Sequence, residues 1–114
     1  MMYKQMTEKL DLMLSKARKI RKKWNVFYVL KAFVVLGRGW HTIDEVYKKA
    51  LELSGNPKLK YYPVQDAIKY GFAELDKEQK ETRVGLLRVK LKDEIYDIIE
   101  REIDRYIQEI EKIA

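Results

Sequence analysis

Gln65 and Lys69 are the two side chains whose types and spacing most clearly indicate a binding site in this sequence. Because they are four residues apart, a helix would place both on one face, where they can contact one ligand together. A side-chain amide and an ammonium group at this spacing can hydrogen-bond to base edges or to phosphates. Asp66 repels phosphate unless it accepts a hydrogen bond from cytosine or pairs with a nearby cation. The segment is therefore a candidate contact for nucleic acid.

Three possible donors, Lys58, Lys60 and Tyr62, precede this pair. Lysine and tyrosine side chains at such positions can bind the phosphate backbone, which fixes the register of a protein on DNA without reading its sequence. The alternative for each lysine is an ordinary solvated surface residue. For Tyr61 and Tyr62, packing under the preceding loop is favoured over contact with nucleic acid.

Catalytic and metal-binding chemistry finds little support in the composition. The chain has no cysteine and one histidine, which excludes disulfides, thiolate metal sites and multi-histidine sites. That histidine, His41, precedes Thr42 and is expected to pack or hydrogen-bond locally. No nucleophile, base and orienting group occur together, and the carboxylates near Arg101 and Arg105 are typical of surface ion pairs. We expect no enzymatic activity, no cofactor and no metal ion.

Charge is unevenly distributed along the chain. Residues 93–114 carry eight acidic and three basic side chains, a net charge of −5, and because the whole chain carries +6, residues 1–92 carry +11. Six cations fall within eight residues, namely Lys16, Arg18, Lys19, Arg21, Lys22 and Lys23. A basic body with an acidic end fits a polyanionic partner. The alternative is that these charges only solvate helix faces, as in the highly charged proteins of thermophiles.

The basic cluster allows three interpretations. It can contact DNA, solvate the outer face of a dimerisation helix, or lie on a membrane surface, and the last needs a bulky apolar face that residues 16–24 do not offer. The candidate DNA contacts in the cluster are Lys16, Lys19, Lys22 and Lys23. No signal peptide is evident, and the longest apolar run, residues 26–36, is too short to cross a bilayer. A cytoplasmic protein without a membrane partner is expected.

Apolar spacing predicts helices in the first half of the chain. Residues 2–24 show the alternating four- and three-residue spacing of a helix that packs on another helix, as in a coiled coil. The apolar positions of this seam are Met6, Leu10, Met13, Ala17, Ile20 and Trp24. Residues 26–36 are nearly all apolar, and Gly37 can end that helix. A capping box from Thr42 to Glu45 predicts the start of a third helix.

The second half of the chain switches from helical to strand spacing. A helix is expected over residues 63–70, closed by Gly71 in a left-handed conformation. Phe72 to Leu75 and Val84 to Leu91 are expected to be strands, because the latter alternates apolar and basic residues, and the polar run 76–83 joins them. A final helix with a stripe of isoleucines should follow.

The stretch DAIKYGFAEL, followed by a polar turn and RVGLLRVKLKDE, resembles the recognition helix and wing of MarR- and PadR-like transcription regulators. This resemblance covers about residues 26–95. It implies a mostly α fold with a small β-hairpin (α+β), a winged helix-turn-helix with long N- and C-terminal helices. The single domain 1–114 would comprise an N-terminal amphipathic helix (1–24), a winged-helix core (25–92) and a C-terminal dimerisation helix (93–114).

The function implied by the resemblance is sequence-specific binding of double-stranded DNA by a homodimeric transcription regulator. Residues 63–70 would enter the major groove, and the wing would touch the backbone through Lys77, Lys80 and Arg83. The wing is electrically neutral, however, whereas a loop that binds phosphate is expected to be basic. The neutral wing favours the alternative, a winged-helix module that binds another protein without direct DNA readout.

Dimerisation is expected through the terminal helices, because their two apolar faces exceed what a small core can cover. The expected interface residues are Met6, Leu10, Met13, Ile99, Ile103, Tyr106 and Ile110. Two recognition helices would then lie about 34–36 Å apart on an inverted repeat. The alternative is that the two terminal helices pack on each other within one chain.

Overall fold

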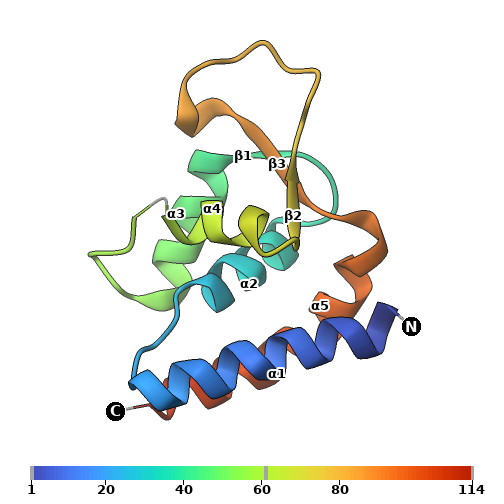
Figure 1. Cartoon of the computed structure of the whole chain (residues 1–114). Coiled ribbons are helices and arrows are strands. Elements are labelled where there is room, and N and C mark those ends of the chain that lie inside the picture. The colour runs from blue at the N-terminus through green and yellow to red at the C-terminus, as the bar shows by residue number, and fades with distance from the viewer. Residues whose placement is uncertain (1, 61, 114) are drawn as a thin grey trace.

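The computed structural model describes residues 2–60 and 62–113 and shows a mostly helical protein with a small antiparallel sheet (Figure 1). The α-helices are α1 (Met2–Ile20), α2 (Val26–Leu36), α3 (Ile43–Ser54), α4 (Tyr62–Lys69) and α5 (Asp93–Glu111). The strands are β1 (His41–Thr42), β2 (Ala73–Leu75) and β3 (Arg88–Leu91), and the 3-10 helix η1 (Val84–Leu86) precedes β3. The expected class, mostly α with a small β component, is confirmed.

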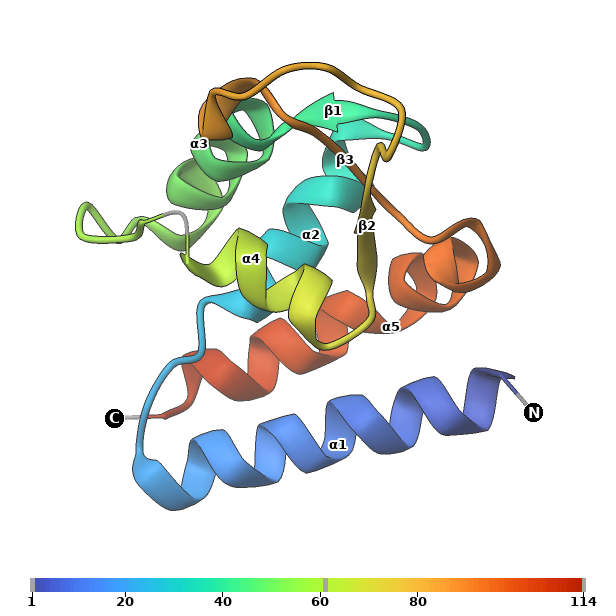
Figure 2. The same ribbon diagram turned by 45° about the horizontal axis from the view of Figure 1, so that its top comes forward.

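Helix α5 lies between α1 and the rest of the molecule (Figure 2). It packs along α1 on one side and against α2 on another. Ile99, Ile103 and Ile110 of this helix have no solvent-exposed surface. The wide isoleucine stripe in the sequence is therefore explained by burial of α5 on two sides.

The seven residues expected to join two subunits lie instead in the core of a single chain. Each of them is at most 8% exposed, and the helices that carry them pack together: Met6, Leu10 and Met13 on α1, and Ile99, Ile103, Tyr106 and Ile110 on α5. Their assignment to a dimer interface is corrected accordingly, because intramolecular pairing covers the apolar surface that pointed to a dimer. A homodimer formed through other surfaces stays a prediction.

Polar contacts fix α1 and α5 side by side in a parallel orientation. The Tyr106 hydroxyl donates to the Asp11 carboxylate at 2.6 Å, and towards the C-terminal ends of both helices Arg18 pairs with Glu109 at 2.6 Å. Tyr106 itself is completely buried. Burial, together with the hydrogen bond to Asp11, raises the pKa of the Tyr106 hydroxyl above its usual value.

The raised pKa of Tyr106 predicts a loss of stability at alkaline pH. An unfolded tyrosine loses its proton near pH 10, whereas the folded protein retains it, so the unfolded state binds fewer protons above that pH. The stabilisation is complete below about pH 10 and should then fall by about 1.4 kcal/mol per pH unit. Urea unfolding between about pH 9 and pH 11 should show a steeper decline for wild type than for Tyr106→Phe.

A control for this experiment is Tyr62→Phe, which changes the side chain of a residue that is 69% exposed. It should decline with pH in the same way as wild type. Parallel curves for wild type and Tyr106→Phe over the same range would contradict the assigned role of the Tyr106 hydroxyl.

The first helix is shorter than its apolar pattern predicts. It ends at Ile20, and Arg21 adopts a left-handed conformation with φ of 54°. Ile20 is 56% exposed and so does not belong to the buried seam, whereas Leu14, which the heptad spacing missed, is buried. Residues 21–25 form a link to α2, called the α1–α2 link below, in which the Trp24 ring packs on the Tyr70 ring in a T-shaped arrangement with 5.6 Å between centroids.

The start of α3 confirms the expected capping box. The Thr42 side-chain oxygen accepts a hydrogen bond from the Glu45 backbone amide at 3.1 Å, and a Glu45 carboxylate oxygen accepts from the Thr42 amide at 3.1 Å. The bond from the Thr42 amide lowers the pKa of the Glu45 carboxyl. Gly71, which follows the end of α4, has a φ of 83°, the left-handed conformation that the sequence predicts for this position.

The sheet formed by the described residues has the strand order β1-β3-β2, with both pairings antiparallel. Strand β1, which pairs Thr42 with Arg88, was not expected from the sequence. The second predicted strand, 84–91, is also corrected: its first part is η1, and β3 begins only at Arg88. A Cβ added at Gly85 would lie 2.6 Å from the Asp44 carboxylate oxygens, so η1 packs closely on the start of α3.

Candidate nucleic-acid interface

Helix α4 presents a polar outer face, as its period predicts. Gln65 and Lys69 are exposed, whereas Val64 and Ala67 on the opposite face have no exposed surface. The ammonium group of Lys69 lies 5.9 Å from the centroid of the Tyr70 ring. The two side chains expected to contact bases are therefore accessible and share one side of the helix.

The α3–α4 loop, residues 55–60, places its lysines near the start of α4. Leu59 is 2% exposed and anchors the loop, while Lys58 and Lys60 on either side of it are exposed. Tyr61 lies outside the described residues. Tyr62 is 69% exposed, so the expectation that it packs under the loop is wrong. Its ring is accessible to a partner.

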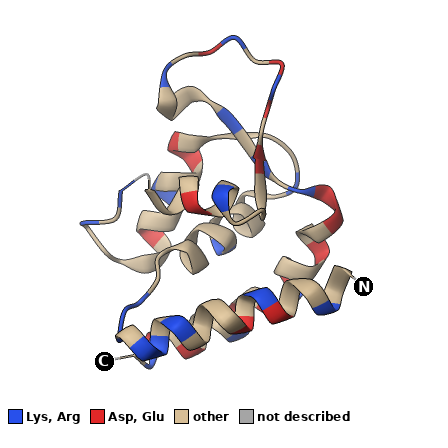
Figure 3. Cartoon of the chain, in the orientation of Figure 1, with Lys and Arg blue, Asp and Glu red and all other residues tan. Residues whose placement is uncertain are grey.

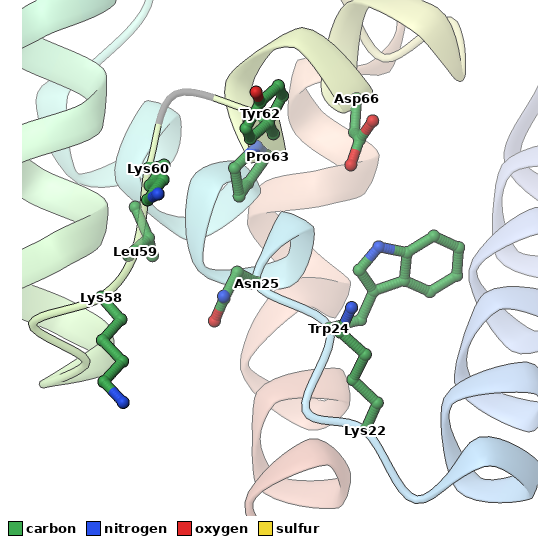
Figure 4. A pocket seen from close by; sticks show the side chains of 9 residues that line it. All are labelled: Lys22, Trp24, Asn25, Lys58, Leu59, Lys60, Tyr62, Pro63 and Asp66. Atoms are coloured by element: carbon green, nitrogen blue, oxygen red, sulfur yellow. The ribbon is translucent and has the colours of Figure 1, made fainter.

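A pocket of about 220 Å³, here called the link pocket, lies between the α1–α2 link, the α3–α4 loop and the start of α4 (Figure 4). Its lining comes from three segments: Lys22, Trp24 and Asn25; Lys58, Leu59 and Lys60; and Tyr62, Pro63 and Asp66. Three of the expected DNA-contacting lysines thus meet at one place. They come from parts of the chain that are far apart in the sequence.

The rest of the N-terminal basic cluster is spread over the end of α1. The ammonium group of Lys16 lies 5.8 Å from the centroid of the Trp24 ring, next to the link pocket. Lys19 and Lys23 are exposed and are not part of its lining. Arg18 is turned towards α5, where it pairs with Glu109. Figure 3 shows these basic residues at the end of α1 and along the link.

The β2–β3 loop, residues 76–87, has acidic and basic residues interspersed over its first part, residues 76–83 (Figure 3). Arg83 pairs with Glu81 at 3.1 Å, and Arg88 at the start of β3 pairs with Asp76 at 2.7 Å. Hydrogen bonds from the Arg83 backbone amide and then from its guanidinium lower the pKa of the Glu81 carboxyl. Among the expected contacts in this loop, Arg83 is therefore already engaged by a carboxylate.

The other two expected contacts of the loop lie on its exposed outer part. Lys77 and Lys80 are both exposed, and no ion pair joins either of them to a described carboxylate. Lys80 lines a hollow of about 290 Å³ that also includes Glu81 and Arg88. The surroundings of Lys80 are therefore of mixed charge.

The base of the β2–β3 loop adjoins α4. A hollow of about 350 Å³ is lined by Lys60, Tyr62, Gln65 and Val84, and Val84 is 46% exposed. This side of the molecule therefore combines an exposed aromatic ring, an amide, an ammonium group and an apolar side chain. Such a surface suits contact with bases or with another protein.

Two further residues line this region although the sequence pattern did not predict them as part of the site. Trp24 continues the heptad spacing and was expected in the helical seam, but it lines the link pocket. Val84 was expected in a strand, but it lines the hollow beside α4. The left-handed Arg21 that redirects the chain before Trp24 has no signal in the sequence pattern either.

Within residues 2–60 and 62–113, no helix is both long and apolar enough to span a membrane. Among the same residues, no group of three or more histidine, aspartate or glutamate side chains is placed to hold a metal ion. Comparisons with protein-family models, with curated proteins and with solved structures found no match to this chain.

Proposed function

We propose that this chain is a winged helix-turn-helix protein that binds double-stranded DNA through α4 and regulates transcription. The observation that carries the proposal is the exposed face of α4 with Gln65 and Lys69, together with the lysines of two other segments that line a pocket at the start of the same helix. Amide and ammonium groups on one helix face suit hydrogen bonds to base edges in a major groove.

The order of the elements supports the same proposal. Three helices, α2, α3 and α4, are followed by β2, a loop and β3, which is the order that the resemblance to MarR- and PadR-like regulators implies. The charge of +11 on residues 1–92 also supports a polyanionic partner. In this proposal α4 is the recognition helix and the β2–β3 loop is the wing.

Salt-dependent binding to duplex DNA tests the proposal. The full chain is titrated into a labelled, mixed-sequence duplex of about 20 base pairs at several salt concentrations, and binding is followed by fluorescence anisotropy. We expect a binding constant whose logarithm falls linearly with the logarithm of the salt concentration, with a slope of about −0.9 for each phosphate contacted. Absence of salt-sensitive binding at low ionic strength would overturn the proposal.

A matched pair of variants shows whether α4 carries the binding. Lys69→Glu on α4 and Lys4→Glu on α1 make the same change in charge at two exposed positions. The first should weaken binding strongly, and the second only slightly, because long-range repulsion is screened by salt. Equal losses of affinity would show that DNA responds only to the net charge of the protein.

The alternative, a protein-binding module, is favoured by the exposed apolar side chains beside α4. Tyr62 is 69% exposed and Val84 is 46% exposed, and both line one hollow. Exposed aromatic rings are frequent anchors in protein interfaces. Failure of the wild-type protein to bind any duplex at low salt would favour this alternative.

A further inference from the structure

The link pocket differs from the wing in its net charge. Lys22, Lys58 and Lys60 are exposed, and among the described residues no carboxylate lies within ion-pair distance of any of them. The described lining contains one carboxylate, Asp66, and three lysines, so the pocket carries an excess of positive charge. An anion placed here would meet unpaired ammonium groups.

Residues on both walls of the pocket are packed against other parts of the protein. The Trp24 ring packs edge-on against Tyr70, which directly follows α4, and Leu59 anchors the opposite wall in the core. Asn25 lies between these two walls in Figure 4. The lysines therefore stand on fixed segments, although their side chains reach into solvent.

The volume of the pocket limits what can occupy it. About 220 Å³ is less than the 300–1,000 Å³ typical of sites for drug-sized ligands, and the pocket is open to solvent. A phosphate group fits such a space and matches the charge of the lining. Because the pocket adjoins the start of α4, a phosphate in it would flank the helix proposed to enter the groove.

The wing is less suited to the same task, because Lys77 and Lys80, which pair with no described carboxylate, belong to a loop without net charge. Arg83 and Arg88 are both paired with carboxylates of the same hairpin, at 3.1 Å and 2.7 Å. To bind a phosphate, either arginine would have to give up an ion pair. The loop as a whole has no net charge over residues 76–83.

We propose that the link pocket binds neighbouring backbone phosphates of one strand of duplex DNA, one for each of its three lysines, so that the α1–α2 link and the α3–α4 loop replace the wing as the main contact with the DNA backbone. This inference rests on the proposed function. In this inference Lys22, Lys58 and Lys60 form one site that binds the DNA strand lying beside α4. The salt dependence of binding is then set mainly by these three residues.

Two triple variants with equal loss of charge test the proposal. One removes the pocket lysines, Lys22→Gln/Lys58→Gln/Lys60→Gln, and the other removes the wing cations, Lys77→Gln/Lys80→Gln/Arg83→Gln. The pocket variant should flatten the salt slope by about 2 to 3 units, so that over a fourfold rise in salt it loses about 40-fold less affinity than wild type. The wing variant should change the slope by less than about one unit.

The outcomes distinguish the role of the pocket from the proposed function. If wild type binds duplex DNA and the wing variant flattens the slope as much as the pocket variant, the inference fails while the proposed function stands. If wild type does not bind duplex DNA, the proposed function fails and the inference falls with it. Circular dichroism spectra of both variants should match wild type, because only exposed side chains are changed.

Trp24 offers a second, direct readout of the pocket. In Trp40→Phe protein, Trp24 is the remaining tryptophan, and its emission should change on titration with duplex DNA but not with inorganic phosphate at the same ionic strength. A saturable change with inorganic phosphate that duplex DNA does not displace would identify a site for a free anion and overturn the proposal. No change with saturating duplex would overturn it as well.

Discussion

Replacement of Ile103 by alanine is expected to lower the free energy of unfolding by about 2–5 kcal/mol. Ile103 has no exposed surface, and its helix, α5, is covered by α1 on one side and by α2 on another. Two packed helices cannot both move to fill the space left by the shortened side chain, so a cavity should remain. Urea unfolding followed by circular dichroism would measure the decrease.

The control for Ile103→Ala is Leu12→Ala on α1. Leu12 is 72% exposed, and its truncation should change the free energy of unfolding by no more than about 0.5 kcal/mol. Similar decreases for the two variants would show that α1 buries a different face from the one seen here.

The same experiment distinguishes pairing within one chain from pairing between two chains. If α1 and α5 pair within the chain, the midpoint of unfolding should not depend on protein concentration. A wild-type midpoint that rises with concentration would show that dimerisation contributes to stability. Such a result would support a homodimer, either through exposed surfaces or through exchange of the terminal helices.

Substitution of the α4 side chains is expected to reduce sequence discrimination rather than binding in general. Gln65→Ala or Lys69→Ala should each lower the discrimination between a preferred site and an unrelated duplex by about 1–3 kcal/mol for each base that the side chain no longer reads. The preferred site is found first by selection from random duplexes with the wild-type protein. Affinities for both duplexes are then compared at one fixed salt concentration, since affinity depends on salt.

Lys58→Ala is the matched control for the α4 variants. Lys58 belongs to the α3–α4 loop, and removal of a phosphate-binding side chain there should weaken binding to all duplexes alike and flatten the salt slope by about one unit. If Gln65→Ala and Lys69→Ala also weaken binding to all duplexes alike, α4 does not read bases.

Elements with a long apolar period or a strong end signal were predictable from the sequence. The capping box at Thr42 and the left-handed Gly71 mark helix ends through local backbone chemistry, and the structure confirms both. Strand β1 was not predictable, because two residues carry no period, and it exists only because β3 lies beside it. Residues 84–86 were expected to continue the alternation of the strand, but they pack on α3 as η1.

The candidate site was predictable only where its parts are close in the sequence. Spacing alone placed Gln65 and Lys69 on one helix face, because helix geometry is local. That Lys22 lines the same pocket as Lys58 and Lys60 depends on where the α1–α2 link runs relative to the α3–α4 loop. Likewise, periodicity cannot show whether the first and last helices pair within one chain or between two chains, since both arrangements bury the same apolar stripe.

The pairing of the first helix with the last constrains how this protein folds during synthesis. The Tyr106 hydroxyl, which donates to Asp11, also lies 3.3 Å from the backbone oxygen of Thr7, so these contacts join positions 95 and 99 residues apart. When α1 leaves the ribosome its partner has not been translated, and closing so long a segment slows folding. Until α5 emerges, the apolar faces of α1 and α2 remain uncovered in the nascent chain and are open to chaperones or to aggregation.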